Sequence, residues 1–133
     1  MDIIVSQVQG RVPVTVLRIQ ERVNLGNAQE LADTARQAVE NGTQNLLVDL
    51  TNVPSITSAG LRTIQIISKL LSDAPTEMGG EAAQTEPASM GLKSRHLKLV
   101  NPSPYVLQVL TTAGFNLFLD IYDNLPAAIA AFQ

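Results

Sequence analysis

The stretch VDLTNVPSITSAGLRTIQIISKLL, residues 48–71, changes its pattern halfway along. It begins as a short apolar run, passes through a turn rich in Thr, Asn, Pro and Ser, and continues with apolar residues at helical spacing. A buried strand that leads through a turn into an amphipathic helix is the repeating unit of alternating α/β folds. The stretch therefore indicates the fold class, and it also places two hydroxyls, Thr57 and Ser58, at the start of a helix.

The composition is typical of a single globular domain. The chain has 133 residues, of which 45% are hydrophobic and 16% are charged, so it is long and apolar enough to bury one core. A net charge of −3 without a basic cluster argues against nucleic-acid binding. The absence of cysteine excludes a disulfide framework and a thiol nucleophile, and a single histidine makes a zinc site improbable. We expect no cofactor and no metal.

We expect neither a secretory signal peptide nor a membrane-spanning segment. Residues 1–12, MDIIVSQVQGRV, have neither the basic region nor the apolar core of a signal peptide. No apolar run approaches the roughly 20 residues that cross a bilayer. We expect a cytoplasmic protein without membrane insertion.

Strand and helix patterns alternate along the chain. Residues 3–8 and 12–19 are β-rich runs separated by a turn at Gly10, which predicts a hairpin. The other expected elements are a helix between Asn27 and Gly42, a strand over 45–50, a helix over 58–72, a strand over 96–100, a helix between Asn101 and Gly114, a strand over 117–122 and a helix over 124–132. This order predicts one open mixed sheet, with an antiparallel hairpin followed by parallel strands, and about four helices packed on it.

Two helix starts have recognisable capping residues. Asn27 followed by Glu30 resembles a capping box, with Asn in place of Ser or Thr. Asn101 before Pro102 fits a helix with its N-cap at Asn and proline at the first helical position. The next residues of that helix, Tyr105 and Val106, are expected in the core.

One segment does not fit a compact α/β domain. Residues 73–95 contain two prolines, three glycines and scattered acids without a sustained period. Loops longer than about 12–15 residues without structure of their own are usually functional or disordered. We expect one domain over residues 1–133 with a flexible insertion at 73–95.

The helix that starts at Ser58 has two distinct faces. The expected core stripe consists of Leu61, Ile64, Ile67 and Leu71, broadened by Ile66 and Leu70. The opposite face consists of Ser58, Arg62, Gln65, Lys69 and Ser72. Ser58 is thus expected on the solvent side, at the positive end of the helix dipole and one turn before a guanidinium, where a phosphate would be favourable. The simpler interpretation is that Thr57 or Ser58 only caps the helix, worth about 1 kcal/mol.

The stretch LLVDLTNVPSITSAGLRTIQII, residues 46–67, resembles the signature of the STAS domain, the fold of anti-sigma factor antagonists. Asp49-Leu50-Thr51 matches its first part, Val53 its middle and Ser58-Ala59-Gly60-Leu61 its end. The hairpin, the VNLGNA run at residues 23–28 and the element order extend the resemblance over nearly the whole chain outside 73–95. The serine that is phosphorylated in this family falls on Ser58.

Two residues depart from the family pattern. Thr57 stands where an acidic residue usually precedes the phosphorylated serine, and Val23-Asn24 stands where Leu-Asp is frequent. Both changes remove negative charge beside the expected site, and Thr57 adds a competing hydroxyl.

The resemblance implies a non-enzymatic partner switch. The unmodified protein would bind an anti-sigma factor that is also an ATP-dependent serine kinase, and so release a sigma factor. Phosphorylation of Ser58 would break that complex, and a metal-dependent, PP2C-type phosphatase would restore it. The expected partner-binding residues are Thr57, Ala59, Gly60, Arg62, Gln65, Lys69, Asn24 and Asp49. Asn24, Leu25 and Gly26 are expected to form a neighbouring loop on the same rim.

Other interpretations remain open at this level. A STAS-like scaffold or transporter-associated module would lack phosphorylation altogether. A small hydrolase could use Ser58, His96 and Asp49, although no Gly-x-Ser-x-Gly elbow is present, and a nucleotide binder lacks a Walker motif. Asp49 either hydrogen-bonds the TNVPS turn or shapes the recognition surface, and both roles are compatible.

Overall fold

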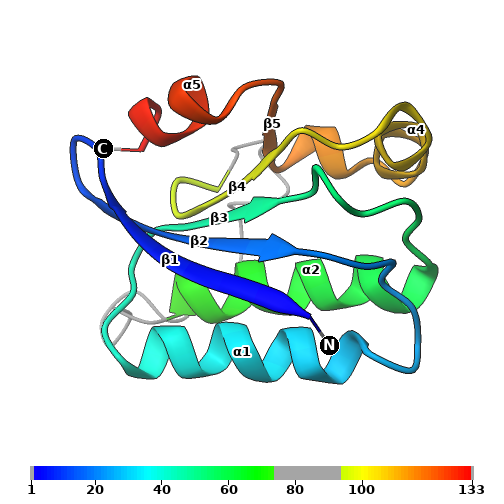
Figure 1. Cartoon of the computed structure of the whole chain (residues 1–133), viewed down its shortest axis with the longest axis horizontal. Coiled ribbons are helices and arrows are strands. Elements are labelled where there is room, and N and C mark those ends of the chain that lie inside the picture. The colour runs from blue at the N-terminus through cyan, green and yellow to red at the C-terminus, as the bar shows by residue number, and fades with distance from the viewer. Residues whose placement is uncertain (1, 74–93, 133) are drawn as a thin grey trace.

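The computed structural model describes residues 2–73 and 94–132 (Figure 1). Nearly all of the expected insertion at 73–95 lies outside these residues, so the insertion stays a prediction, as does the assignment of residues 1–133 to one domain. Within the described residues, no helix has both the length and the apolarity needed to cross a membrane.

Five strands form one mixed sheet in the order β1-β2-β3-β4-β5. They are β1 (Ile3–Gln9), β2 (Pro13–Ile19), β3 (Leu46–Asp49), β4 (Leu97–Val100) and β5 (Asp120–Tyr122). β1 pairs antiparallel with β2, and every later neighbour is parallel. The predicted fold class is therefore confirmed, including the initial hairpin.

Helices cover the two faces of the sheet unequally. α1 (Ala28–Glu40) and α2 (Ser58–Asp73) lie side by side on one face, whereas α5 (Leu125–Ala130) lies on the other (Figure 1). The larger core cluster includes Leu17 and Ile19 of β2, together with residues of α1, α2 and α4 (Pro104–Thr112). The smaller cluster joins Val14 and Val16 of β2 to α5. Because side chains of a strand alternate between faces, β2 supplies both cores.

The N-cap of α4 is Ser103, so the expectation of Asn101 and Pro102 was wrong. The Ser103 hydroxyl accepts a hydrogen bond from the Val106 N–H, and Pro104 takes the first helical position. Asn101 instead adopts a left-handed conformation with φ 58°, and its N–H donates to the Tyr122 carbonyl. Pro102 begins no helix, because the helix starts two residues later at Pro104.

The expected strand over 117–122 is shorter than predicted. Gly114 ends α4 in a left-handed conformation, as expected, but residues Phe115–Leu117 then form a 3₁₀ turn, η1. This turn buries Phe115 in the larger core, and β5 begins only at Asp120.

Two smaller expectations also differ from the structure. Asn27 is the N-cap residue of α1, but its side chain makes no capping hydrogen bond to the helix, so the capping box does not form. Val106 is buried as expected, whereas Tyr105 is exposed on the outer side of α4.

Candidate functional site

The start of α2 is held next to the segment that precedes α1. Val23 and Ile56 form an isolated parallel bridge. The Val23 N–H donates to the Ser55 carbonyl, and the Thr57 N–H donates to the Val23 carbonyl, both at 3.0 Å. Two loops far apart in the sequence are thereby joined at the residue before Ser58.

The loop before α1 is closed by two asparagines. The Asn24 N–H donates to Asn27 Oδ1 at 2.9 Å, and Asn24 Oδ1 accepts from the Gly26 N–H at 2.9 Å. Asn27 Nδ2 also donates to the Arg22 carbonyl. This closed turn leaves Leu25 with 82% of its surface exposed, beside the start of α2. Asn24 therefore shapes the loop that presents Leu25.

Gly60 permits the close approach of these segments. It is buried, and a Cβ built on it would lie 2.6 Å from Ile56 Cγ1 and 2.7 Å from Val23 Cγ1. Real Cβ atoms do not approach carbon so closely, so a side chain at this position would push α2 away from Val23. Gly60 was expected to contact a partner, but being buried it contributes to the surface only through this packing.

Ser58 is exposed at the first position of α2, as its place on the helix face predicts. Thr57, immediately before it, is also exposed. Within residues 2–73 and 94–132, neither hydroxyl takes part in a side-chain hydrogen bond. The capping interpretation is therefore not supported, and both hydroxyls belong to exposed residues.

A groove of about 670 Å³ lies between the starts of α1 and α2, beside Ser58. We call it the Ser58 groove. Its lining residues are Asn24, Leu25, Ala28, Gln29, Ala32, Thr57, Ser58, Ala59, Arg62, Thr63 and Ile66. Ala28 and Ala32 of α1 have short side chains, which leaves the groove open opposite Ile66. Ile66 was expected to broaden the core stripe, but it is 39% exposed in this groove.

The remaining residues of the predicted face divide into two groups. Arg62 is exposed and lines the groove one turn after Ser58. Gln65 and Lys69 are also exposed, but they lie further along α2 and outside the groove lining. The side chain of Ser72 lies outside the described part of the chain.

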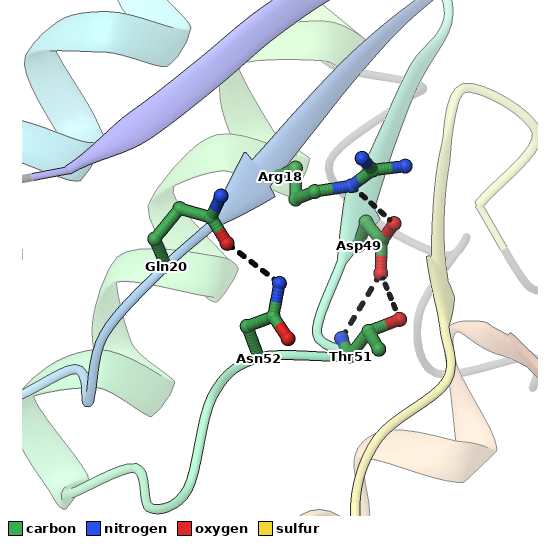
Figure 2. Close-up of polar contacts among 5 residues, drawn as sticks. All are labelled: Arg18, Gln20, Asp49, Thr51 and Asn52. Carbon is green, nitrogen blue, oxygen red and sulfur yellow. Dashed lines mark hydrogen bonds and ion pairs between the residues drawn. The ribbon is translucent and has the colours of Figure 1, made fainter.

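Asp49 is buried at the end of β3 and holds the loop that leads toward Ser58 (Figure 2). Its Oδ2 pairs with Arg18 Nε at 3.0 Å. Its Oδ1 accepts from the Thr51 N–H at 3.0 Å and from the Thr51 hydroxyl at 2.6 Å. The same loop is tied to β2 by Asn52 Nδ2, which donates to Gln20 Oε1. These contacts confirm that Asp49 hydrogen-bonds the turn, and its carboxylate does not line the Ser58 groove.

His96 lies at the other end of the strands from Ser58. Its carbonyl accepts from the N–H of Leu46, the first residue of β3, and its Nδ1 lies 3.1 Å from Asn45 Oδ1. Burial, followed by the positive charge of Arg95, lowers the pKa of His96 below its ordinary 6.5.

Asp49 lies at the carboxyl end of β3 and Ser58 follows that end, whereas His96 lies beside the amino end of the strand, so the structure does not bring the three residues together. The hydrolase interpretation therefore loses its candidate triad. Nor does the described part of the chain gather three or more His, Cys, Asp or Glu side chains that could hold a metal.

Sequence reasoning did not include Leu25, Gln29 or Ile66 among the partner-binding residues. Leu25 carried a usable signal, since a lone leucine between Asn24 and Gly26 belongs to no helix or strand face that could bury it. Ile66 carried none, because its exposure depends on the short alanines of the neighbouring helix.

Comparisons with known proteins agree on one family. The profile of the STAS domain matches residues 4–78, more than half of the 133-residue chain. BtrV of Bordetella bronchiseptica, which carries a provisional name as an anti-sigma factor antagonist, is 27% identical over 115 residues, covering 86% of this chain and 83% of BtrV.

Solved structures show the same architecture. The Thermotoga maritima protein TM1081 superimposes with a TM-score of 0.71 at 23% identity, covering 95% of this chain and 90% of that one. The anti-sigma factor antagonist SpoIIAA in its unphosphorylated form gives a TM-score of 0.66 at 15% identity, covering 96% and 91%. With the signature at residues 46–67 and the five-stranded mixed sheet, these matches show that the chain belongs to the STAS domain family.

Proposed function

We propose that this protein is an anti-sigma factor antagonist that works as a non-enzymatic partner switch in the cytoplasm, controlled by phosphorylation of Ser58. The single observation that carries the proposal is the exposed Ser58 hydroxyl at the start of α2, beside a groove with exposed apolar side chains. The provisional name of BtrV and the description of SpoIIAA point to the same class of function.

The surroundings of Ser58 suit an acceptor of phosphate. The first N–H groups of α2 and the helix dipole give this end a partial positive charge, and Arg62 adds a full charge one turn further. A phosphoryl group would carry a charge of roughly −1.5 to −2. The fold of this protein would therefore tolerate a phosphate on Ser58. Phosphorylation would mainly change the affinity for a protein docked on the Ser58 groove.

The partner that fits this surface is an anti-sigma factor with serine kinase activity. Leu25 and Ile66 supply exposed apolar surface in the lining of the Ser58 groove, and this groove can receive a partner side chain. A kinase that binds here would hold the Ser58 hydroxyl at the centre of the contact. A metal-dependent phosphatase of the PP2C type would remove the phosphate and reset the switch.

The electrostatic penalty is large enough for switching. Two like charges about 4 Å apart at an effective dielectric constant of about 20 repel by about 4 kcal/mol. That energy corresponds to about three decades in affinity. Removing water from the phosphate adds to the penalty.

Phosphosite mapping tests the assignment of the acceptor. The protein, Ser58→Ala and Thr57→Ala would each be incubated with ATP and the serine kinase that modifies the unchanged protein. We expect one phosphate on the unchanged protein and on Thr57→Ala, and none on Ser58→Ala. Modification that survives in Ser58→Ala and is lost in Thr57→Ala would overturn the assignment.

A further inference from the structure

Within residues 2–73 and 94–132, β1 is an edge strand of the sheet, and five of its seven residues are exposed. It stands first in the strand order, with β2 on one side (Figure 1). Ile4 is 46% exposed and Val5 is 50% exposed, and these two neighbours lie on opposite faces of the sheet. On the face that carries α1, Val5 lines a hollow with Gln37 and Ala38, so α1 does not cover this residue of β1.

The hydrogen bonds of the hairpin show which groups of β1 are directed outward. The Gln20 N–H donates to the Asp2 carbonyl, and the Gly10 N–H donates to the Val12 carbonyl. In an antiparallel pair the residues alternate between those bonded to the partner and those turned away from it. The even-numbered residues of β1 therefore bond to β2. The backbone groups of Ile3, Val5, Gln7 and Gln9 point to the open edge.

This edge lacks the features that prevent strands from pairing between molecules. Residues 3–9, IIVSQVQ, contain no charge and no proline. The seven pairs with β2 run in unbroken register, so no bulge twists the edge away. Short, charged, bulged or proline-containing edges are the usual protection against pairing, and β1 has none of these features.

We propose that β1 pairs antiparallel with β1 of a second copy of this chain, with the two-fold axis at Ser6. In this register the outward groups of Val5 face those of Gln7 in the other copy, and those of Ile3 face Gln9. Ser6 stands opposite its own counterpart as a pair without mutual hydrogen bonds. The two sheets become one continuous sheet of ten strands.

Two features of the chain favour a second copy over another partner. A symmetric contact needs a self-complementary surface, and an uncharged strand meets itself without repulsion. The charged residues nearest to the two ends of β1 are Asp2 and Arg11, of opposite sign. Antiparallel pairing brings Asp2 of one copy to the end where Arg11 of the other lies. On the face toward α5, the half-exposed Ile4 lies opposite Val8 of the second copy and gains apolar contact.

A cysteine placed on the axis tests the register directly, since the natural chain has no cysteine. In the proposed pair the two residues at position 6 have Cα atoms about 4.5 Å apart, within the range that a disulfide bridges. Ser6→Cys should therefore form a covalent dimer under mild oxidation.

The matched control is Ile4→Cys, which places an exposed thiol on the same face of the same strand. Its counterpart would lie about 14 Å away along the strand direction, so this variant should stay uncrosslinked. Equal crosslinking of the two variants, or none in Ser6→Cys, would overturn the proposal.

Sedimentation equilibrium of the unchanged full chain and three variants provides the second readout. The unchanged chain should reach twice the mass of one chain. Val5→Pro removes an outward donor without touching the bonds to β2 and should be monomeric, whereas Val5→Thr keeps the donor and should remain dimeric. Ser6→Lys, which brings two ammonium groups together on the axis, should also be monomeric and serves if Val5→Pro fails to fold. A monomeric unchanged chain, or dimers in both Val5→Pro and Ser6→Lys, would count against the pairing.

The dimer and the partner switch are separable by experiment. No residue of β1 lines the Ser58 groove, so a failure of the crosslinking test leaves the Ser58 assignment unaffected.

Discussion

Gly60 is the residue on which the close approach of α2 to Val23 depends. A Cβ at this position would lie 2.6 Å from Ile56 and 2.7 Å from Val23, both of which are buried. Gly60→Ala should lower the free energy of unfolding by about 1–3 kcal/mol through overpacking. Urea denaturation measures this change. The control is Ser58→Ala on the same helical turn, where the exposed position should keep the change within about 0.5 kcal/mol. A Gly60→Ala variant as stable as the unchanged protein would show that the contact is not tight.

His96 should make the stability of the protein depend on pH in a definite direction. Burial, with Arg95 next, lowers its pKa in the folded state, whereas the unfolded chain keeps a value of about 6.5. The unfolded state therefore binds more protons between these two values. The contribution of His96 to stability is complete above pH 6.5 and is lost as the pH falls to the folded pKa.

The variant His96→Gln isolates this contribution, because the chain contains a single histidine. Between neutral and mildly acidic pH the unchanged protein should lose more unfolding free energy than the variant does. Denaturation at a series of pH values measures the difference. Parallel curves for the two proteins would contradict the lowered pKa.

The loop between β3 and α2 is fixed by Asp49 at one end and by the bridge to Val23 at the other. Asp49→Ala removes three hydrogen-bond contacts and leaves the Thr51 N–H without its acceptor. We expect a loss of about 1–3 kcal/mol in unfolding free energy. Asn52→Ala removes only an exposed hydrogen bond to Gln20 and should change stability by less than about 0.5 kcal/mol. The two variants measured side by side decide whether the buried carboxylate supports the loop.

Helices and strands with sustained hydrophobic patterns could be predicted from the sequence, whereas the N-cap of α4 and the start of β5 could not. In NPSP, residues 101–104, both Asn101 and Ser103 precede a proline and both are good N-cap residues. The structure uses Ser103 because Asn101 is left-handed, with φ 58°, whereas an N-cap residue is typically extended. The Asn101 N–H is bonded to Tyr122, a residue of β5 far along the chain. β5 is likewise shorter than predicted because Phe115 is buried in the larger core, a tertiary contact that the local sequence pattern does not indicate.

Across the whole molecule, the sequence placed Ser58 and Arg62 on the solvent side but did not reveal the groove beside them. The groove exists because two loops are joined through Val23 and Ile56, and because α1 presents short alanines to Ile66. A single sequence contains the residues of such a surface without showing which of them meet.

Leu25 provides a test of the groove as a docking surface. Leu25→Lys places a charge where an apolar partner surface would lie, so affinity for the kinase that modifies the protein should fall at least tenfold, while stability stays unchanged. Leu117→Lys is the matched control, because Leu117 is also highly exposed, at 67% against 82%, and lies outside the groove lining. Isothermal titration calorimetry measures both affinities. Equal affinities for the two variants would place the contact elsewhere.

The most direct test of the partner switch is the affinity of the kinase for two forms of this protein, unmodified and phosphorylated on Ser58, measured by calorimetry under the same conditions. A like charge in the contact predicts that affinity falls by about three decades on phosphorylation. Equal affinity of the two forms would contradict the proposed switch, because phosphorylation of Ser58 would then have no effect on binding of the kinase.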